Sequence, residues 1–252
     1  MKSQTTALGI DIGGTYIKAA LADTSTGNIT DDIITVKTPA QMPPDSLVRA
    51  VGDIVSALDW SGPIGVGYPG VVKHGVCLSA ANISDSWLNQ DARQLFSALT
   101  EQKVTVLNDA DAAGIAEMRF GAGDKEPSDE TVTVVLTLGT GIGSAVFCGR
   151  TLFPNTEFGH LEVDGHDAES KAAASVRVRD RLSWEDWAER LNRYLAEIEK
   201  LLSPDIIILG GGVSENYKHF SDFLTPRAEL RVARLGNTAG LIGAALAVSD
   251  LV

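Results

Sequence analysis

Short apolar runs separated by turns open the chain. Residues Ala7–Asp11 and Tyr16–Ala22 are mostly apolar, and Gly13–Gly14 separates them. This arrangement predicts a β-hairpin. Turn-forming residues occupy Thr24–Asn28, and the loose alternation over Ile29–Val36 predicts a third strand. We therefore expect the first sheet to begin with antiparallel strands.

Helical spacing appears next. Apolar residues recur at intervals of three or four between Leu47 and Leu58, which predicts an amphipathic helix with Asp45 as its N-cap. Strands and helices then alternate. We expect strands at 64–67 and 104–107 and helices at 91–99 and 111–120. This alternation predicts an α/β fold.

The second half of the chain repeats the strand, glycine turn and strand of its start. A β-branched run over Thr131–Leu138 leads into the turn 139–143, and its partner strand is expected at 145–147. Further on we expect a helix over Ser183–Leu202, a strand over Ile206–Leu209 and a closing helix over Thr238–Val248. The long helix has an apolar stripe that contains Trp184 and Trp187, which we interpret as core or interface packing.

Glycine turns directly follow three of the predicted strands, at 11–15, 138–143 and 209–213. Glycine lets backbone N–H groups approach phosphate oxygens without a Cβ between them. Taken alone, each segment is explained as a tight turn, but the three together, two of them with a threonine, favour phosphate binding. The chain has no P-loop motif and no dinucleotide-binding motif after its first strand, so the phosphate site must be of another kind.

Composition narrows the function classes. The two cysteines, Cys77 and Cys148, cannot build a disulfide framework or a four-thiolate zinc site, and we expect a reducing, cytoplasmic location. The first residues lack a signal-peptide pattern, and no apolar run is long enough to span a bilayer. The net charge of −12 argues against binding to nucleic acid or to an anionic membrane. A polyanionic substrate is still compatible, because salt screens charges beyond about 10 Å.

The residues around these turns resemble a known family. The segments DIGGT at 11–15, LNDADAA at 107–113, TLGTGIGS at 137–144 and EFGH at 157–160 are similar to motifs of the ROK family of sugar kinases. The resemblance implies a two-domain, actin-like ATPase (ribonuclease H-like) fold with mixed sheets and an active-site cleft between the domains. We expect a small N-terminal domain over 1–108, completed by 238–252, and a large C-terminal domain over 109–237.

Four further segments resemble the polyphosphate-using branch of this family in particular: GVVKHGV at 70–76, AANISDSW at 80–87, PNTEFGHLEVDG at 154–165 and DAESKAAASVRVR at 167–179. Typical members of the wider family carry a cysteine-rich zinc loop soon after the Gly-His pair. Here no cysteine follows Cys148, so no zinc is expected. His160 occupies the position of the usual metal ligand, and two interpretations stay open for it: a contact to sugar hydroxyls, or a buried structural histidine.

The resemblance also implies the sugar site. Sugar phosphorylation needs a carboxylate near the reacting hydroxyl, and Asp109 is the candidate base. As an N-cap is the other common use of aspartate at this place, we expect Asp111 to cap the helix and Asp109 to react. Asn108 and Asp109 are expected to bind the sugar together with Gly70, Asn82, Glu157, His160 and Glu169. Glu162 is a rival to Glu169, because the missing cysteine loop leaves the register open.

The phosphate site is implied in the same way. Asp11 is expected to hold Mg²⁺ through water, and the phosphate-binding or nucleotide-binding residues are expected to be Gly13, Gly14, Thr15, Thr140, Gly141, Gly211 and Gly212. Lys18 either adds positive charge there or is a solvated strand residue. A basic run beyond the sugar motif either guides a long phosphate chain or forms a solvated helix face; it comprises Lys171, Arg177, Arg179 and Arg181.

These expectations define a function and its rivals. We expect phosphoryl transfer from polyphosphate, and from ATP as well, to the 6-hydroxyl of glucose or mannose. A strictly ATP-dependent hexose or amino-sugar kinase would share every residue named above. A sugar-sensing repressor is disfavoured, because only about ten residues precede Asp11, and an actin-like scaffold does not explain the Asn108–Asp109 and Glu157–His160 motifs. By resemblance we expect a homodimer, for which the helix with Trp184 and Trp187 offers an apolar surface.

Overall fold

The computed structural model describes residues 5–80, 83–123 and 127–248. Two compact units divide the chain: one runs to Ala116 and resumes at Thr238, and the other covers Glu117–Asn237. Each unit is built around a five-stranded sheet of mixed direction. The division falls inside a helix, whereas the sequence led us to expect it at Asp109.

The sheet of the first unit has the strand order β3-β2-β1-β4-β7. Its strands are β1 (Thr6–Ile12), β2 (Tyr16–Asp23), β3 (Ile34–Lys37), β4 (Ile64–Tyr68) and β7 (Val104–Asn108). Strands β1, β2 and β3 are antiparallel neighbours, which confirms the predicted hairpin, while β1, β4 and β7 run parallel. The third strand is shorter than predicted, since Ile29 makes only a single bridge, to Ala22.

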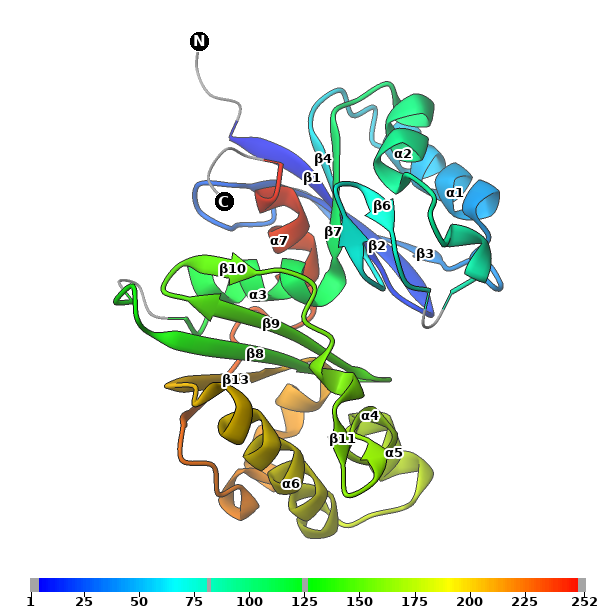
Figure 1. Ribbon diagram of the computed structural model, residues 1–252. Helices are drawn as coiled ribbons and strands as arrows, with labels where there is room; N and C mark the ends of the chain where they lie inside the picture. The colour runs from blue at the N-terminus through cyan, green and yellow to red at the C-terminus, as the bar shows by residue number, and fades with distance from the viewer. Residues whose placement is uncertain (1–4, 81–82, 124–126, 249–252) are drawn as a thin grey trace. The chain divides into compact units, whose positions relative to one another are not determined.

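Helices cover both sides of this sheet (Figure 1), with α1 (Pro44–Ala57) and α2 (Ala92–Thr100) on one side and α7 (Ala239–Leu246) on the other. Pro43 is the N-cap of α1, so the prediction that Asp45 caps it was wrong; Asp45 lies in the first turn. Helix α7 lies very close to the sheet, because a Cβ at Gly9 or Gly65 would overlap its backbone. Small elements complete the unit: β5 (Val72–Lys73), β6 (Val76–Cys77) and the 3₁₀ helix η1 (Asp85–Trp87).

The sheet of the second unit has the order β10-β9-β8-β13-β14. Its strands are β8 (Val132–Leu138), β9 (Ile142–Cys148), β10 (Thr151–Phe153), β13 (Ile206–Gly210) and β14 (Glu229–Val232). Strands β8 and β9 form the predicted hairpin, and β13 pairs with β8 and β14 in parallel. The sheet therefore repeats the plan of the first one, a hairpin extended by parallel strands.

The long helix α6 (Trp184–Leu202) begins at its N-cap Ser183 and buries the apolar stripe expected from the sequence. Trp187 is completely buried, and its indole N–H donates to the carbonyls of Ala172 and Ala173. Trp184 is half-buried and stacks on Phe220. Core packing is thus confirmed for Trp187, and Trp184 packs against the same core. Trp187 cannot contribute to a dimer surface on this helix, and the homodimer itself stays a prediction.

Short elements fill the rest of the second unit. They are η2 (Phe158–His160), β11 (Glu162–Val163), β12 (His166–Asp167), α4 (Glu169–Ala172), α5 (Ala174–Arg179), η3 (Gly212–His219) and η4 (Ser221–Phe223). No helix among the described residues combines the length and the apolar composition needed to cross a membrane.

The chain passes from one unit to the other twice, within α3 (Asp109–Phe120) and within the 3₁₀ helix η5 (Gly236–Thr238). Glu117 lies just after the first passage and is buried. Its carboxylate accepts hydrogen bonds from the backbone N–H groups of Ala122, Arg234 and Leu235. One buried acid therefore ties the end of α3 to the segment that leads into the second passage.

Candidate active site

One edge of the first sheet gathers the predicted residues of that unit. Strands β1, β4 and β7 are parallel, so their carboxyl ends lie at the same edge, and Asp11 is in register with Gly67. Gly70 follows β4 closely, while Asn108 ends β7 and Asp109 begins α3. Ligands of open α/β sheets bind outside the carboxyl ends of the strands. The backbone topology thus places these side chains where a ligand would be expected.

Asn108 fixes the geometry around Asp109. It is buried, with 5% of its surface exposed, and its amide donates to the Gly70 carbonyl at 3.2 Å. Its Oδ1 accepts from the Asp111 N–H at 2.9 Å, so Asn108 caps the first turn of α3. The prediction that Asp111 is the cap was therefore wrong. Asp109 is only partly buried, and its Oδ1 accepts from the Ala110 N–H at 2.8 Å.

Asp11 is the second carboxylate at this edge. A Cβ at Gly240, in the first turn of α7, would lie 2.9 Å from its carboxylate, so the small residue at 240 leaves room for the acid. Burial raises the pKa of Asp11, and the charge of Lys18, its cross-strand partner, opposes that rise. Lys18 is half-buried and lies opposite Asp11, and its contribution to phosphate binding stays a prediction.

Hydrogen bonds from Thr38 hold the first glycine turn on its protein side. The hydroxyl of Thr38 donates to the Gly13 carbonyl at 2.7 Å, and the Thr38 N–H donates to the Thr15 carbonyl at 3.0 Å. Gly14 and Thr15 are exposed, and no atom comes within 4 Å of a Cβ built on Gly14. The turn is therefore rigid on its protein side and open on the other, as a phosphate-binding turn requires.

The second glycine turn, after β8, is fastened by Ser175. The Ser175 hydroxyl donates to the Thr140 carbonyl at 2.7 Å, and its N–H donates to the Gly139 carbonyl at 3.0 Å. The carboxylate of Glu169 accepts from the Ile142 N–H at 2.8 Å, and a Cβ at Gly141 would overlap that carboxylate. Glycine at 141 is thus required for the approach of Glu169.

The third glycine turn follows β13, at the same edge of the second sheet as the turn after β8, because the two strands are parallel. Gly211 has φ +78°, and a Cβ there would overlap the backbone of Leu138. The N–H and hydroxyl of Ser214 both donate to the Gly211 carbonyl. Gly211 is therefore needed for close packing of the two strand ends, whereas Gly212 is exposed with nothing within 4 Å of a built Cβ.

Glu157, His160 and Glu169 form an interacting cluster in the second unit. The pKa of His160 is raised, mainly by its hydrogen bond to Asp167, with the charges of Glu169 and Glu157 adding to the effect. The pKa of Glu157 is raised by burial and by the charge of Glu169, while His160 opposes the shift. Electrostatic coupling of all three shows that the fold brings these predicted residues together.

His160 is an exposed residue with one firm partner. Its Nδ1 lies 2.8 Å from Oδ2 of Asp167, and its side chain is 47% exposed. The interpretation as a buried structural histidine was therefore wrong. The pairing of His160 with Asp167 could not be anticipated from the sequence, because the small β11–β12 hairpin that brings them together has only two residues in each strand.

Glu162 and Glu169, the two candidates for the same sugar contact, lie in different places. Glu162 is exposed on β11, opposite Asp167 in the hairpin register, whereas Glu169 reaches the turn after β8. Thr38, Ser175 and Gly240 also support the site, and sequence patterns gave no signal for them because their partners are distant along the chain. Asn82 lies outside the described residues.

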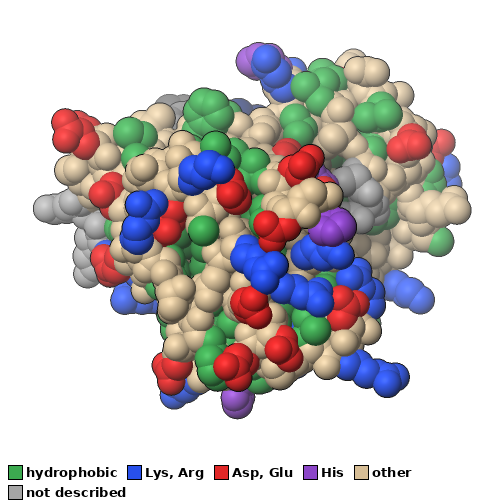
Figure 2. All heavy atoms as spheres, turned by 60° about the horizontal axis from the view of Figure 1, so that its bottom comes forward, with side chains coloured by type: hydrophobic (Ala, Val, Ile, Leu, Met, Phe, Trp, Pro, Cys, Tyr) green, Lys and Arg blue, Asp and Glu red, His purple; other side chains and the backbone are tan. Residues whose placement is uncertain are grey.

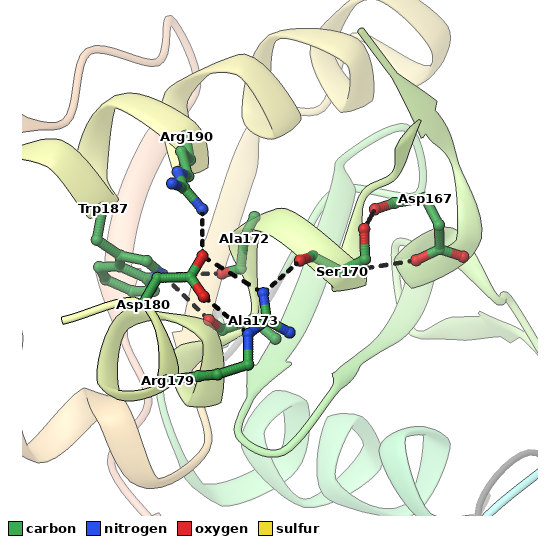
Figure 3. Close-up of polar contacts among 8 residues, drawn as sticks. All are labelled: Asp167, Ser170, Ala172, Ala173, Arg179, Asp180, Trp187 and Arg190. Atoms are coloured by element: carbon green, nitrogen blue, oxygen red, sulfur yellow. Dashed lines mark hydrogen bonds and ion pairs between the residues drawn. The ribbon is translucent and has the colours of Figure 1, made fainter. Parts of the chain in front are cut away.

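Two of the four side chains in the basic run, those of Arg177 and Arg179, have structural partners. Figure 2 brings forward the part of the molecule with α4, α5 and α6, where Lys and Arg side chains lie among Asp and Glu. Arg177 stacks 3.7 Å from the centre of the Trp184 ring. Arg179 donates to the Ser170 carbonyl and to Asp180, which Arg190 also contacts (Figure 3). Arg177 and Arg179 thus fasten α5 to its neighbours.

The side chains present bear on the expectation that Asp11 holds Mg²⁺. No group of three or more His, Cys, Asp or Glu side chains suited to a metal ion occurs in the described part of the chain. Magnesium commonly uses one or two carboxylates together with water and substrate phosphates. Asp11, a partly buried carboxylate near an open glycine turn, fits that mode of binding.

Comparison with known proteins gives consistent results. The model of the ROK family matches residues 7–175. A polyphosphate glucokinase of Mycobacterium tuberculosis (strain ATCC 25618 / H37Rv) is 46% identical over 97% of this chain and 92% of its own length. The inorganic polyphosphate/ATP-glucomannokinase of Arthrobacter sp. strain KM is similar in structure, with a TM-score of 0.91, 43% identity and coverage of 97% of this chain and 98% of the other. A ROK family glucokinase from Streptomyces griseus, solved in complex with glucose and AMPPNP, has a TM-score of 0.81 and 25% identity over 96% of this chain and 99% of its own.

Proposed function

The chain belongs to the ROK family, and we propose that it is a kinase that transfers a phosphoryl group from inorganic polyphosphate to the 6-hydroxyl of glucose. The family and the fold class predicted from the sequence are confirmed by these similarities. One observation carries the chemical part of the proposal: the partly exposed carboxylate of Asp109 at the carboxyl end of β7, held in place by its own helix and by the buried cap Asn108.

Asp109 is proposed to be the general base. Its carboxylate takes the proton of the sugar 6-hydroxyl while that oxygen forms a bond to the terminal phosphorus of the donor. The bond between this phosphorus and the bridging oxygen breaks, and the shortened polyphosphate leaves with the electron pair. Because Asn108 bonds both to Gly70 and to the first turn of α3, the base is presented on a rigid support.

The other sugar contacts are proposed to come from the acidic cluster. Carboxylates accept hydrogen bonds from several vicinal hydroxyls, and this suits Glu157 and Glu169. The bond from His160 to Asp167 leaves the second ring nitrogen to face a sugar oxygen. Gly70, Asn82 and Asn108 are also proposed as sugar contacts.

The phosphate chain is proposed to bind at the glycine turns. Gly13, Gly14, Thr15, Thr140, Gly141 and Gly212 supply backbone N–H groups or hydroxyls, and Gly211 shapes its turn. Asp11 would hold Mg²⁺ through water, and Lys18 tunes the charge there. When bound, Mg²⁺ would neutralise negative charge on the phosphate oxygens.

Five finer points go beyond this reaction. ATP is proposed as a second donor and mannose as a second acceptor, since the Arthrobacter enzyme is a polyphosphate/ATP-glucomannokinase. A homodimer, a cytoplasmic location and the absence of zinc stay predictions from the sequence. The competing hypothesis is a strictly ATP-dependent kinase with the same catalytic residues.

Glucose 6-phosphate formation by the purified protein, with Mg²⁺ and either long-chain polyphosphate or ATP, tests the proposal. We expect turnover with polyphosphate, and a loss of about a hundredfold or more in kcat for Asp109→Asn. Asp45→Asn, an exposed change in α1, is the matched control and should retain native activity. Turnover with ATP alone would move the protein to the competing hypothesis, and native activity of Asp109→Asn would exclude this base.

A further inference from the structure

A small basic pocket lies in the second unit, beside the candidate active site. Its volume is about 290 Å³, and the β11–β12 hairpin, α4 and α6 form its walls. The charged or polar residues that line it are Asp164, His166, Lys171, Arg190, Arg193 and Tyr194. Three cationic side chains therefore face one aspartate, in a chain whose net charge is −12.

The three cationic side chains differ in their ion pairs. Arg193 contacts Asp164 at 3.2 Å and Glu189 at 2.6 Å, and Arg190 contacts Asp180 at 3.0 Å. These pairs hold the two guanidinium groups in place. Lys171 is exposed on α4, and no ion pair with it is found within the described ranges. An incoming anion would meet one ammonium group without an ion pair and two guanidinium groups that are held by acids.

Tyr194 supplies an independent indication of a ligand. It is completely buried and lines the pocket, yet its hydroxyl has no hydrogen-bond partner among the residues described. Buried polar groups normally have partners, and an unpaired one destabilises the fold. Burial and the charge of Glu169 raise the pKa of Tyr194, so its hydroxyl stays protonated and is available as a donor.

Helix α4 connects this pocket with the phosphate turn. Glu169 bonds to Ile142 in the turn after β8, and Lys171, two residues further along, lines the pocket. Both lie within one unit, so their relative position is fixed by the same packing. Helix α4 thus contributes one residue to the glycine turn and another to the pocket.

We propose that the pocket formed by Lys171, Arg190, Arg193 and Tyr194 binds a phosphate group of the polyphosphate chain beyond the group that is transferred. The proposal rests on the proposed function and deepens it. The donors match phosphate oxygens, and the volume lies at the lower end of the range for small-molecule sites, which suits a phosphate group. The basic run predicted from the sequence thus contributes Lys171, while Arg177 and Arg179 serve the packing of α5.

Chain-length dependence of the Michaelis constant tests the proposal. Lys171→Ala and Tyr194→Phe should each raise KM for long-chain polyphosphate, the first by about tenfold, which corresponds to the loss of one charged contact. KM for tripolyphosphate and KM for ATP should stay at the native values, because on this proposal neither donor extends from the glycine turns into the pocket. Lys200→Ala is the matched control and should behave as native. Lys200 lies on α6, as Tyr194 does, but it pairs with Glu197 and does not line the pocket.

Calorimetric titration without glucose gives a second readout. Long-chain polyphosphate should bind Lys171→Ala more weakly than the native protein. Lys171→Ala should keep the native melting temperature, and Tyr194→Phe, which removes an unpaired buried hydroxyl, should not lower it. If both variants kept the native KM for long-chain polyphosphate and the native binding affinity, the pocket would not be a polyphosphate site, and the proposed function would still stand. If Lys171→Ala weakened only inorganic phosphate or glucose 6-phosphate, the pocket would be a site for a free phosphate compound, and the chain assignment would be wrong. If the native protein showed no turnover with polyphosphate, polyphosphate would be excluded as the donor, and the proposed phosphate pocket would be excluded as well.

Discussion

Nδ1 of His160 lies 2.8 Å from Oδ2 of Asp167, across the turn that joins η2 to the β11–β12 hairpin. Asp167 is itself held in place, because it accepts from the Ser170 N–H and its carbonyl accepts from the Ser170 hydroxyl (Figure 3). The carboxylate orients the imidazole and favours its protonated form. The exposed imidazole of His160 therefore has a defined orientation.

Removal of the charge at Asp167 should lower the pKa of His160. The hydrogen bond to Asp167 is the main cause of the raised pKa, and Asp167→Asn replaces it with a neutral partner. Because the folded pKa is above the ordinary value of 6.5, the pair stabilises the protein at low pH, and that contribution is lost as the pH rises through the folded pKa. NMR titration of His160 checks the shift, with Asp31→Asn, an exposed loop change, as the control. An unaltered titration curve in Asp167→Asn would contradict the assignment.

Gly141→Ala should damage the turn that carries the proposed phosphate contacts. The added Cβ would overlap the Glu169 carboxylate, so either the turn or α4 must move. We expect activity to fall with both donors and the free energy of unfolding to fall by about 1–3 kcal/mol. Gly139→Ala is the matched control for stability, since nothing lies within 4 Å of its built Cβ. Equal stability losses in the two variants, measured by urea denaturation, would argue against the role of close approach.

Asn108→Ala should separate capping from substrate binding. The variant removes the cap of α3 and the bond to Gly70, and we expect a stability loss of about 1 kcal/mol or more. Asp91→Ala is its counterpart, because Asp91 caps α2 through the Gln94 N–H. Both variants should be less stable, but only Asn108→Ala should raise KM for glucose. If Asp91→Ala raised KM equally, the effect would come from general destabilisation.

Glu117→Ala should be among the most destabilising single changes in the chain. It leaves the backbone N–H groups of Ala122, Arg234 and Leu235 without their buried acceptor, at an expected cost of about 2–4 kcal/mol in the free energy of unfolding. Chemical denaturation checks this value, and Glu130→Ala, an exposed change before β8, is the control. A loss below that of an ordinary surface substitution would show that Glu117 does not anchor this junction.

Local patterns were sufficient for most of the architecture. The hairpins around 13–14 and 139–143, the strand over Ile206–Leu209 and the amphipathic helix α6 follow from apolar periodicity and glycine placement, which are properties of neighbouring residues. The errors were also local. The predicted caps at Asp45 and Asp111 failed because Pro43 and Asn108 occupy the capping positions, and a cap is set by backbone angles at a single residue.

By itself the sequence determined the family, the strand and helix order, and the identity of the acids and glycines that we assign to sugar and phosphate. It could do so because motifs such as DIGGT and LNDADAA place several residues of one site within a few positions of each other. Only the tertiary structure decided that Glu169 and not Glu162 reaches the turn at Ile142, that Asp167 holds His160, and that Tyr194 joins Lys171 in one pocket. These relationships join residues on different elements, and their geometry depends on how the elements pack, which no local pattern of residues specifies.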